Sequence, residues 1–184
     1  GTNGMLEKIV DNTNRKVAYT YEPLVGTMLP CLATASQIVP SGATNPPMRW
    51  GYTYTNYNNA PLLKTHSMPS PTGVGVSTLT LNYDVKGRVI AQIDGNGIKS
   101  AYTYLHNRTI VDTYDAQDVK VDTFTQYYDD LGRNTGVEDA NGRSTMIIYG
   151  DPGNPSVPTS TIDKDGRVTL VTPDSFGNLV GILK

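Results

Sequence analysis

The sequence predicts an all-β protein made of consecutive antiparallel β-hairpins, and three observations support this. Short runs alternate apolar and polar residues, as the two faces of a strand do. Turn signals with Asp in the first place and Gly in the fourth separate these runs. Gly and Pro supply 18 and 12 of the 184 residues, which suits many turns and opposes a mainly helical chain.

The clearest unit lies between Tyr83 and Tyr104 and contains two turn signals, 84–87 and 94–97, around one short strand. An Asp side chain accepts a hydrogen bond from a backbone N–H two residues on, and Gly takes the positive φ that closes a short hairpin loop. We therefore expect both signals to reverse the chain. The strand before the first turn places Leu79 and Leu81 on one face and Thr78 and Thr80 on the other.

The unit recurs along the chain, which indicates a repeat protein. When the numbering is shifted by 45, eight of 22 positions coincide between 83–104 and 128–149. A shift of 83 toward the N-terminus matches Lys99 to Tyr104 with 16–21, where Asn14 takes the place of Gly97 and preserves the turn. The residues expected to define the repeat are Asp11, Tyr83, Asp84, Gly87, Arg88, Asp94, Gly97, Tyr104, Tyr128, Asp129, Gly132, Arg133, Asp139, Gly142, Tyr149, Asp163, Gly166, Arg167, Asp174 and Gly177.

The N-terminal part, 1–65, is expected to hold repeat-like strands interrupted by a Pro-rich insertion at 22–49. A turn at 11–14 precedes a strand that ends at Tyr21. Within the insertion, prolines exclude a long helix, and the apolar segment 28–39 is either a short buried strand or a plug. Strands are predicted at 50–57 and 62–65.

The stretch 66–75 is expected to be a loop or linker because it is rich in Pro and Gly. Residues 76–184 then form the main array of hairpins, with a further hairpin around 115–118 and a last pair of turns at Asp163 and Asp174. We expect one continuous repeat domain. Because the chain stops within a strand-like run, we also expect it to be a fragment of a larger protein.

Three segments carry a family resemblance: Tyr83-Asp84-x-x-Gly87-Arg88, Tyr128-Asp129-x-x-Gly132-Arg133 and the weaker Asp163-x-x-Gly166-Arg167. They resemble the core of Rhs, or YD-repeat, proteins. The resemblance implies a ribbon of hairpins whose curved or spiralling sheet forms a shell. In bacterial toxin complexes and polymorphic toxins such shells enclose a C-terminal toxin or effector, and in teneurin-like proteins a related shell supports adhesion. It also implies a secreted or cell-surface location in bacteria.

Two features of such toxin shells are not matched. The segment 151–154 departs from the Asp-Pro-x-Gly pattern of the self-cleaving core, so no protease residues are expected. The chain is also too short to close a shell of this kind. We therefore interpret it as a piece of the ribbon whose exposed strand edges can pair with another copy.

Composition gives no signal for several partner classes. A formal net charge of −2 provides no basic footprint for nucleic acid, and no apolar run reaches the length of a membrane span. Cys31 is the sole cysteine, so no intrachain disulfide can form, and we expect it to be a small buried apolar residue. His66 and His106 lack metal-ligand spacing, and no phosphate loop, nucleophile elbow or dinucleotide fingerprint occurs. We expect no enzyme activity and no cofactor.

Three side-chain patterns have both a functional and a structural interpretation. The turns at 94–97, 139–142 and 163–166 resemble the start of a calcium loop, yet hairpin chemistry explains all three. Arg88, Arg133 and Arg167 are expected to pair with a turn Asp or to lie over a Tyr ring instead of forming a basic ladder for an acidic partner. The tyrosines are expected to pack across strands, with sugar stacking as the alternative.

The function predicted from the sequence is a non-enzymatic structural segment of a shell that encapsulates or presents a toxin or effector. Its partners would be the rest of the shell and that cargo. The alternative is an adhesion module that binds a glycan or a protein through exposed tyrosines and the loops at 22–49 and 66–75. A third hypothesis places an enzyme site in 22–49.

Overall fold

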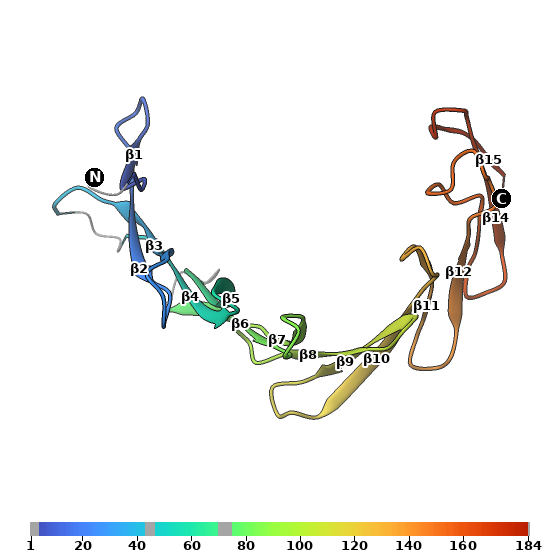
Figure 1. The fold of residues 1–184 in the computed structure, drawn as a ribbon, viewed down its shortest axis with the longest axis horizontal. Coiled ribbons are helices and arrows are strands. Elements are labelled where there is room, and N and C mark those ends of the chain that lie inside the picture. Colours follow the sequence, from blue (N-terminus) through green and yellow to red (C-terminus); the bar gives the residue numbers. More distant parts are fainter. Residues whose placement is uncertain (1–3, 43–46, 70–74, 184) are drawn as a thin grey trace. The chain divides into compact units, whose positions relative to one another are not determined.

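The computed structural model describes residues 4–42, 47–69 and 75–183. Strands are its only regular elements there, and they confirm the all-β prediction (Figure 1). Their bounds are β1 Lys8–Val10, β2 Lys16–Pro23, β3 Pro30–Ile38, β4 Arg49–Tyr57, β5 Ala60–Pro69, β6 Val76–Tyr83, β7 Val89–Ile93, β8 Lys99–Tyr104, β9 Arg108–Tyr114, β10 Lys120–Tyr128, β11 Asn134–Glu138, β12 Ser144–Ile148, β13 Ser160–Ile162, β14 Val168–Pro173 and β15 Leu179–Leu183.

The strands are neighbours in one sheet in the order in which they follow one another in the chain. Each strand whose register is given pairs antiparallel with the strand before or after it, as in Lys8↔Ala18 and Met146↔Ile162. Every such pairing is therefore a hairpin or its direct continuation. The sheet divides into two compact units, residues 1–99 and 100–184.

The N-terminal unit has two faces of different chemistry, because side chains alternate along its strands. Cross-strand partners place Tyr19, Ala35 and Trp50 in one row, and Tyr52, His66 and Leu79 in another row on the same side. The opposite side carries threonine pairs, and the hydroxyls of Thr20 and Thr34 lie 2.7 Å apart, those of Thr53 and Thr65 2.6 Å apart.

In the C-terminal unit, one side of β12–β15 carries apolar residues that face solvent. Register places Met146, Ile162 and Val168 side by side, and it aligns Ile148, Ser160 and Leu170 in the next row. Met146, Val168 and Leu170 are each about half exposed. Ile148, Ile162 and Leu183 lie on the same side of the sheet.

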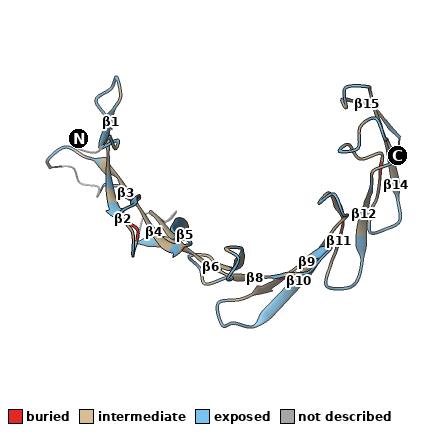
Figure 2. Ribbon diagram, viewed as in Figure 1, coloured by how far each residue is buried: buried red, intermediate tan, exposed pale blue. Residues whose placement is uncertain are grey.

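A second layer of structure does not cover either unit in the described residues. Leu24, Cys31 and Val111 are the buried apolar residues there, and Ser160 is the buried polar one. Figure 2 shows the strands almost entirely in the colours of intermediate and exposed residues. The stability of this sheet therefore comes from ladder hydrogen bonds, turns and half-buried cross-strand contacts.

Two predicted irregular segments contain regular strand. In the expected insertion at 22–49, β3 pairs with β2 on one side and with β4 on the other. Of the two interpretations of 28–39, a short buried strand or a plug, the strand is present, although most of β3 is half-buried. The prolines allow this because Pro23 ends β2 and Pro30 begins β3, so neither interrupts a strand interior. In the expected linker at 66–75, residues 66–69 belong to β5 and pair with 76–79 of β6. Residues 70–74 lie outside the described residues.

Candidate functional site

The repeated feature of this chain is a hairpin turn closed by an Asp carboxylate, which we call the Asp turn. Its first residue is Asp11, Asp84, Asp94, Asp115, Asp129, Asp139, Asp163 or Asp174. In each turn the Asp N–H donates to the carbonyl four residues on, and the N–H of the fourth residue donates back to the Asp carbonyl. This is a three-residue hairpin loop that ends in a left-handed residue.

The Asp side chain adds two further hydrogen bonds inside the loop. In the turn at 129–133, Oδ1 of Asp129 accepts the N–H groups of Leu131 and Arg133, each at 3.0 Å. Gly132 between them has φ of 75°. Asn14 and Asp118 occupy the same place with φ of 62° and 63°, because Asn and Asp tolerate the left-handed region better than other side chains do.

The fifth residue of several Asp turns is an arginine that pairs with the turn carboxylate. Its side chain contacts Oδ2 of the Asp at 2.7 Å for Arg88, 2.6 Å for Arg133 and 3.0 Å for Arg143. Arg15 does the same with Asp11. The arginine of the weakest sequence match, Arg167, lies 3.8 Å from Asp163 and is 77% exposed. Sequence analysis missed Arg15 and Arg143, although their spacing from Asp was the available signal.

These hydrogen bonds favour the charged form of the carboxyl groups. The guanidinium of Arg133 first, and then the backbone N–H groups, lower the pKa of Asp129. For Asp84, Asp139 and Asp163 the backbone N–H of the fifth residue is the largest cause of a lowered pKa. The carboxylates of these four turns thus act as ionised acceptors within their own loops.

A tyrosine hydroxyl bonds to the backbone in or just before the neighbouring strand at the open end of the hairpin. Tyr21 donates to the Leu6 carbonyl at 3.1 Å, and Tyr149 donates to the Asn134 carbonyl at 2.9 Å. Tyr83 donates to the Leu63 carbonyl of β5 and directly precedes the Asp turn at 84. Tyr104 holds the equivalent place, ten residues after Asp94. An Asp turn and a tyrosine hydroxyl together bracket one hairpin.

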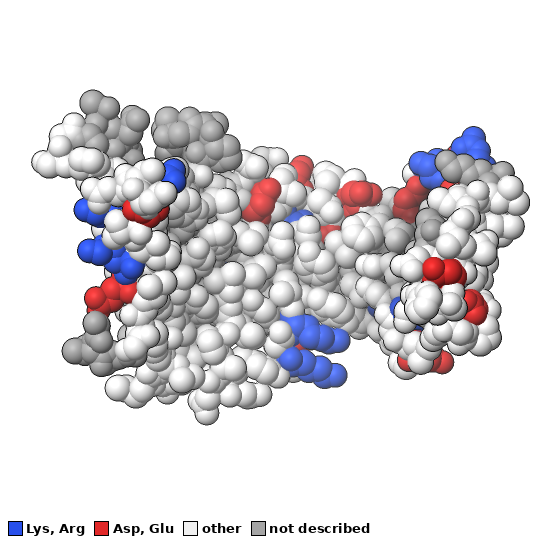
Figure 3. All heavy atoms as spheres, turned by 90° about the horizontal axis from the view of Figure 1, so that it is seen from above, with Lys and Arg blue, Asp and Glu red and all other residues white. Residues whose placement is uncertain are grey.

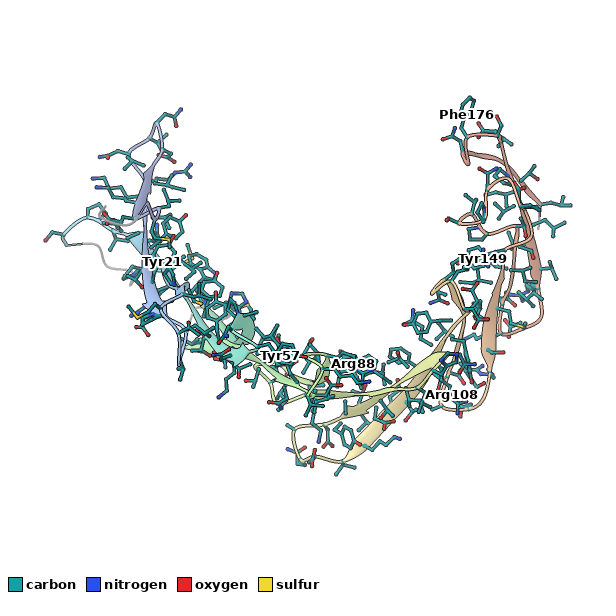
Figure 4. The ribbon with its side chains drawn as sticks, in the orientation of Figure 1. Tyr21, Tyr57, Arg88, Arg108, Tyr149 and Phe176 are labelled. Carbon is teal, nitrogen blue, oxygen red and sulfur yellow. The ribbon has the colours of Figure 1, made fainter. Side chains whose placement is uncertain are left out.

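Arg133 joins several of these contacts in the C-terminal unit. Its guanidinium lies 4.4 Å from the centre of the Tyr149 ring, pairs with Asp129 and donates to the Pro155 carbonyl. Both expected roles of the repeat arginines, a turn ion pair and a place over a tyrosine ring, are present at this residue. Figure 4 labels Tyr149, which directly follows β12.

Two hollows lie in the N-terminal unit. One, of about 240 Å³, is lined by Leu24, Cys31, Leu32, Tyr52 and Tyr54 with neighbouring residues of β2–β4. Burial raises the pKa of the Tyr54 hydroxyl there. The other, of about 340 Å³, lies beside Trp50. Both involve the Pro-rich region that sequence analysis treated as an insertion.

His66 and Cys31 pack within the N-terminal unit, whereas His106 is exposed between β8 and β9. His66 stacks on Tyr52 with ring centres 4.9 Å apart, and its Nε2 is buried with no hydrogen-bond partner among the described residues. Cys31 is buried, 3.9 Å from the Leu29 carbonyl. In the described residues, no group of three or more His, Cys, Asp or Glu side chains is placed to hold a metal ion. Likewise, no helix there has the length and apolarity to cross a membrane.

Charged residues make up 17% of the sequence. Figure 3 shows Lys and Arg, and Asp and Glu, in small separate groups with wide uncharged areas between them on the face in view. In the turns, several Asp and Arg side chains form ion pairs that neutralise each other locally.

No protein-family model matches the chain, and no curated protein matches it. Among solved structures it is similar to chains in the crystal structures of TcdB2-TccC3-Cdc42 and of TcdB2-TccC3. The TM-scores are 0.35 and 0.36, both at 13% identity over 96% and 98% of this chain. A third, TcdB2-TccC3-TEV, has a TM-score of 0.34 at 14% identity. The chain spans only 12% to 13% of the length of these chains.

Proposed function

We propose that this chain is a non-enzymatic segment of a larger β-sheet wall. The observation that carries the proposal is the uncovered sheet: in the described residues each unit is a single layer with almost no buried core. A wall needs this construction, because its strands must pair along the sheet while both faces stay available to what lies inside and outside.

The exposed area is larger than that of a compact, self-contained domain of the same mass, which favours a segment of a larger assembly. The chain exposes 12512 Å². A compact chain of 19.9 kDa would expose about 8,700 Å², and two separate compact bodies of half that mass about 10,400 Å² in total. The area of the chain exceeds even the reference for two separate bodies.

The finer part of the proposal rests on the Tyr-Asp-x-x-Gly-Arg motif. The wall would belong to an Rhs-like shell of a secreted or surface bacterial protein, and the shell would enclose or present a polypeptide toxin or effector. The motif residues have structural roles consistent with a repeat: Asp84 and Asp129 close turns, and Tyr83 bonds to the preceding strand. The rest of the shell and its cargo would be the partners.

Recognition of a glycan by the tyrosines is less well supported. The hydroxyls of Tyr21, Tyr83 and Tyr149 already donate to backbone carbonyls, and their rings are half-buried. A stacking platform for a sugar needs a free ring face with polar groups beside it.

The proposal is tested through the free strand edges. In the described residues β1 and β15 each pair on one side. The Asp11 N–H donates to the Arg15 carbonyl, and the Tyr19 N–H donates to the Glu7 carbonyl. Because successive N–H groups of a strand point to opposite sides, the N–H of Val10 points away from β2. Light scattering on a size-exclusion column should show association that grows with concentration, as expected for unpaired edges.

Val10→Pro should reduce this association, because proline removes the outward N–H without removing a bond to β2. Val10→Ala is the matched control, since it shortens the same side chain and keeps the N–H. A monomer at every concentration would contradict the proposal and favour an independent binding module.

A further inference from the structure

The hollow beside Trp50 has the size and lining of a small-molecule site. Its volume is about 340 Å³, which lies within the range of about 300–1,000 Å³ that is usual for ligand pockets. Apolar side chains form most of the lining: Ile9, Val17, Met48 and Trp50. The wall proposal gives this hollow no role.

Register explains how four strands build the hollow. Ile9 of β1 lies opposite Val17 of β2, and Val17 lies opposite Gln37 of β3. The Gln37 N–H donates to the Met48 carbonyl at 2.8 Å, which brings Trp50, two residues further on, to the same side. The apolar residues are therefore held by paired strands.

The polar groups of the hollow have unused capacity. No hydrogen bond joins the Gln37 amide to another part of the chain that the structure describes. Arg15 holds Asp11 through its Nε at 2.5 Å, and its side chain remains 78% exposed. Lys16 also lines the hollow, but it precedes Val17 in β2, so its side chain lies on the opposite side of the sheet. The cation on the side of Val17 is therefore Arg15, and its outer guanidinium nitrogens are donors suited to an anion.

We propose that this hollow binds a small carboxylate whose body is a flat apolar ring, of the arylacetate type. The ring would cover Trp50 and Val17 and displace water from them. The carboxylate would accept hydrogen bonds from the outer guanidinium nitrogens of Arg15 and from the Gln37 amide. A sugar fits less well, because its ring carries hydroxyls all round, and the mainly apolar lining offers few polar groups besides the Gln37 amide and Arg15 to satisfy them.

Trp50 provides a direct readout because it is the only tryptophan of the chain. Phenylacetate is titrated into the unaltered protein while tryptophan fluorescence is recorded, with phenylacetamide and methyl glucoside in parallel. We expect a saturable change with phenylacetate, about fivefold weaker binding of the uncharged amide, and no change with the glucoside.

The role of Arg15 is tested by Arg15→Gln, which should reduce the affinity for phenylacetate to that of the amide. Arg143→Gln is the matched control, because it breaks an equivalent Asp–Arg turn pair in the other unit and should leave binding unchanged. The comparison of acid with amide needs no variant, so it stands even if Arg15→Gln fails to fold.

Three results would overturn the inference. No fluorescence response to phenylacetate would mean that the hollow is not a site. Equal affinity for acid and amide would mean an apolar cleft without selectivity for an anion. A response to the glucoside alone would make it a sugar site. None of these outcomes depends on self-association through β1, so the wall proposal is judged separately.

Discussion

At the scale of the residue, one carboxylate organises each hairpin loop. Asp129 accepts two backbone N–H groups with Oδ1 and a guanidinium with Oδ2, so a single side chain fixes both the loop and the first residue of the next strand. Eight turns along the chain use this arrangement with small variations. Asn178, for example, donates to Asp174 where other turns have arginine.

Asp129→Ala should lower the melting temperature clearly more than Asp130→Ala does. Both changes remove one negative charge from the same loop, but Asp130 is exposed and makes no hydrogen bond or ion pair among the described residues. Thermal melts followed by circular dichroism compare the two variants. Equal melting temperatures would show that charge alone, and not the loop hydrogen bonds, accounts for any effect.

Stability should fall in acid because the pKa values of several turn carboxyls are lowered in the folded chain, among them those of Asp84, Asp129 and Asp139. A lowered folded pKa gives stability that is complete above the unfolded value of about 4 and is lost as pH falls through the folded values. Urea titrations should give a constant unfolding free energy from neutral pH down to about pH 5 and a decline below about pH 4. An increase on acidification would contradict this.

Tyr149→Phe should cost about 1 kcal/mol, the usual value of one net hydrogen bond. The variant keeps the ring beneath Arg133 and loses only the bond to the Asn134 carbonyl. Tyr128→Phe is the control, because the Tyr128 hydroxyl has no partner in the described structure. Urea denaturation measures the loss of unfolding free energy in both variants. An equal loss would show that the bond from Tyr149 to the Asn134 carbonyl adds no stability.

At the scale of the element, two kinds of glycine serve the hairpins. Gly142 lies in a turn with φ of 75°, and a Cβ there would meet no atom within 4 Å. Gly136 lies inside β11, and a Cβ there would come 2.6 Å from the Thr145 carbonyl oxygen of β12. The first glycine is needed for its backbone conformation, and the second for the close approach of two strands.

These two needs predict different responses to substitution. Gly142→Ala should cost about 1 kcal/mol, and Gly142→Asn should restore most of it, as Asn14 does in its own turn. Gly136→Ala should cost about 1–3 kcal/mol because β11 and β12 must separate, and Gly136→Asn should be no better. Urea denaturation gives these values, and rescue of Gly136 by Asn would refute the steric explanation.

At the scale of the whole molecule, each strand depends on its immediate neighbours. Because pairings join strands that are consecutive in the chain, stability should resemble a sum of local terms, as in other repeat proteins. Opening of one hairpin need not open a distant one. The two units are the natural boundaries for such partial unfolding.

Gly136→Ala should therefore raise amide hydrogen exchange in β9–β12 much more than in β2–β5. Exchange measured by mass spectrometry on peptides resolves the two regions in one experiment. Gly51→Ala is the reciprocal variant, since its Cβ, 2.6 Å from the Ser67 hydroxyl of β5, would displace that hydroxyl from its hydrogen bond to the Gly51 carbonyl. If either variant raised exchange equally in both units, the chain would unfold as one cooperative body.

Sequence patterns were sufficient where a feature depends on neighbours along the chain. Asp at the first place and Gly at the fourth predicted the turns at 84–87 and 129–132, because these loops close through bonds within five residues. Alternation likewise predicted strands such as β6 and β10. The all-β class and the succession of hairpins followed from these local signals.

Other features depended on residues that only the folded sheet brings together. Prolines suggested an insertion at 22–49 and a linker at 66–75, yet β3 is paired on both sides and 66–69 are part of β5, because the partner strands accept prolines at strand ends. The hollow beside Trp50 needs the registers of four strands at once, so no local pattern contains it. Turn chemistry is local and can be predicted from the sequence, whereas cross-strand register and exposed area arise only when the strands pair.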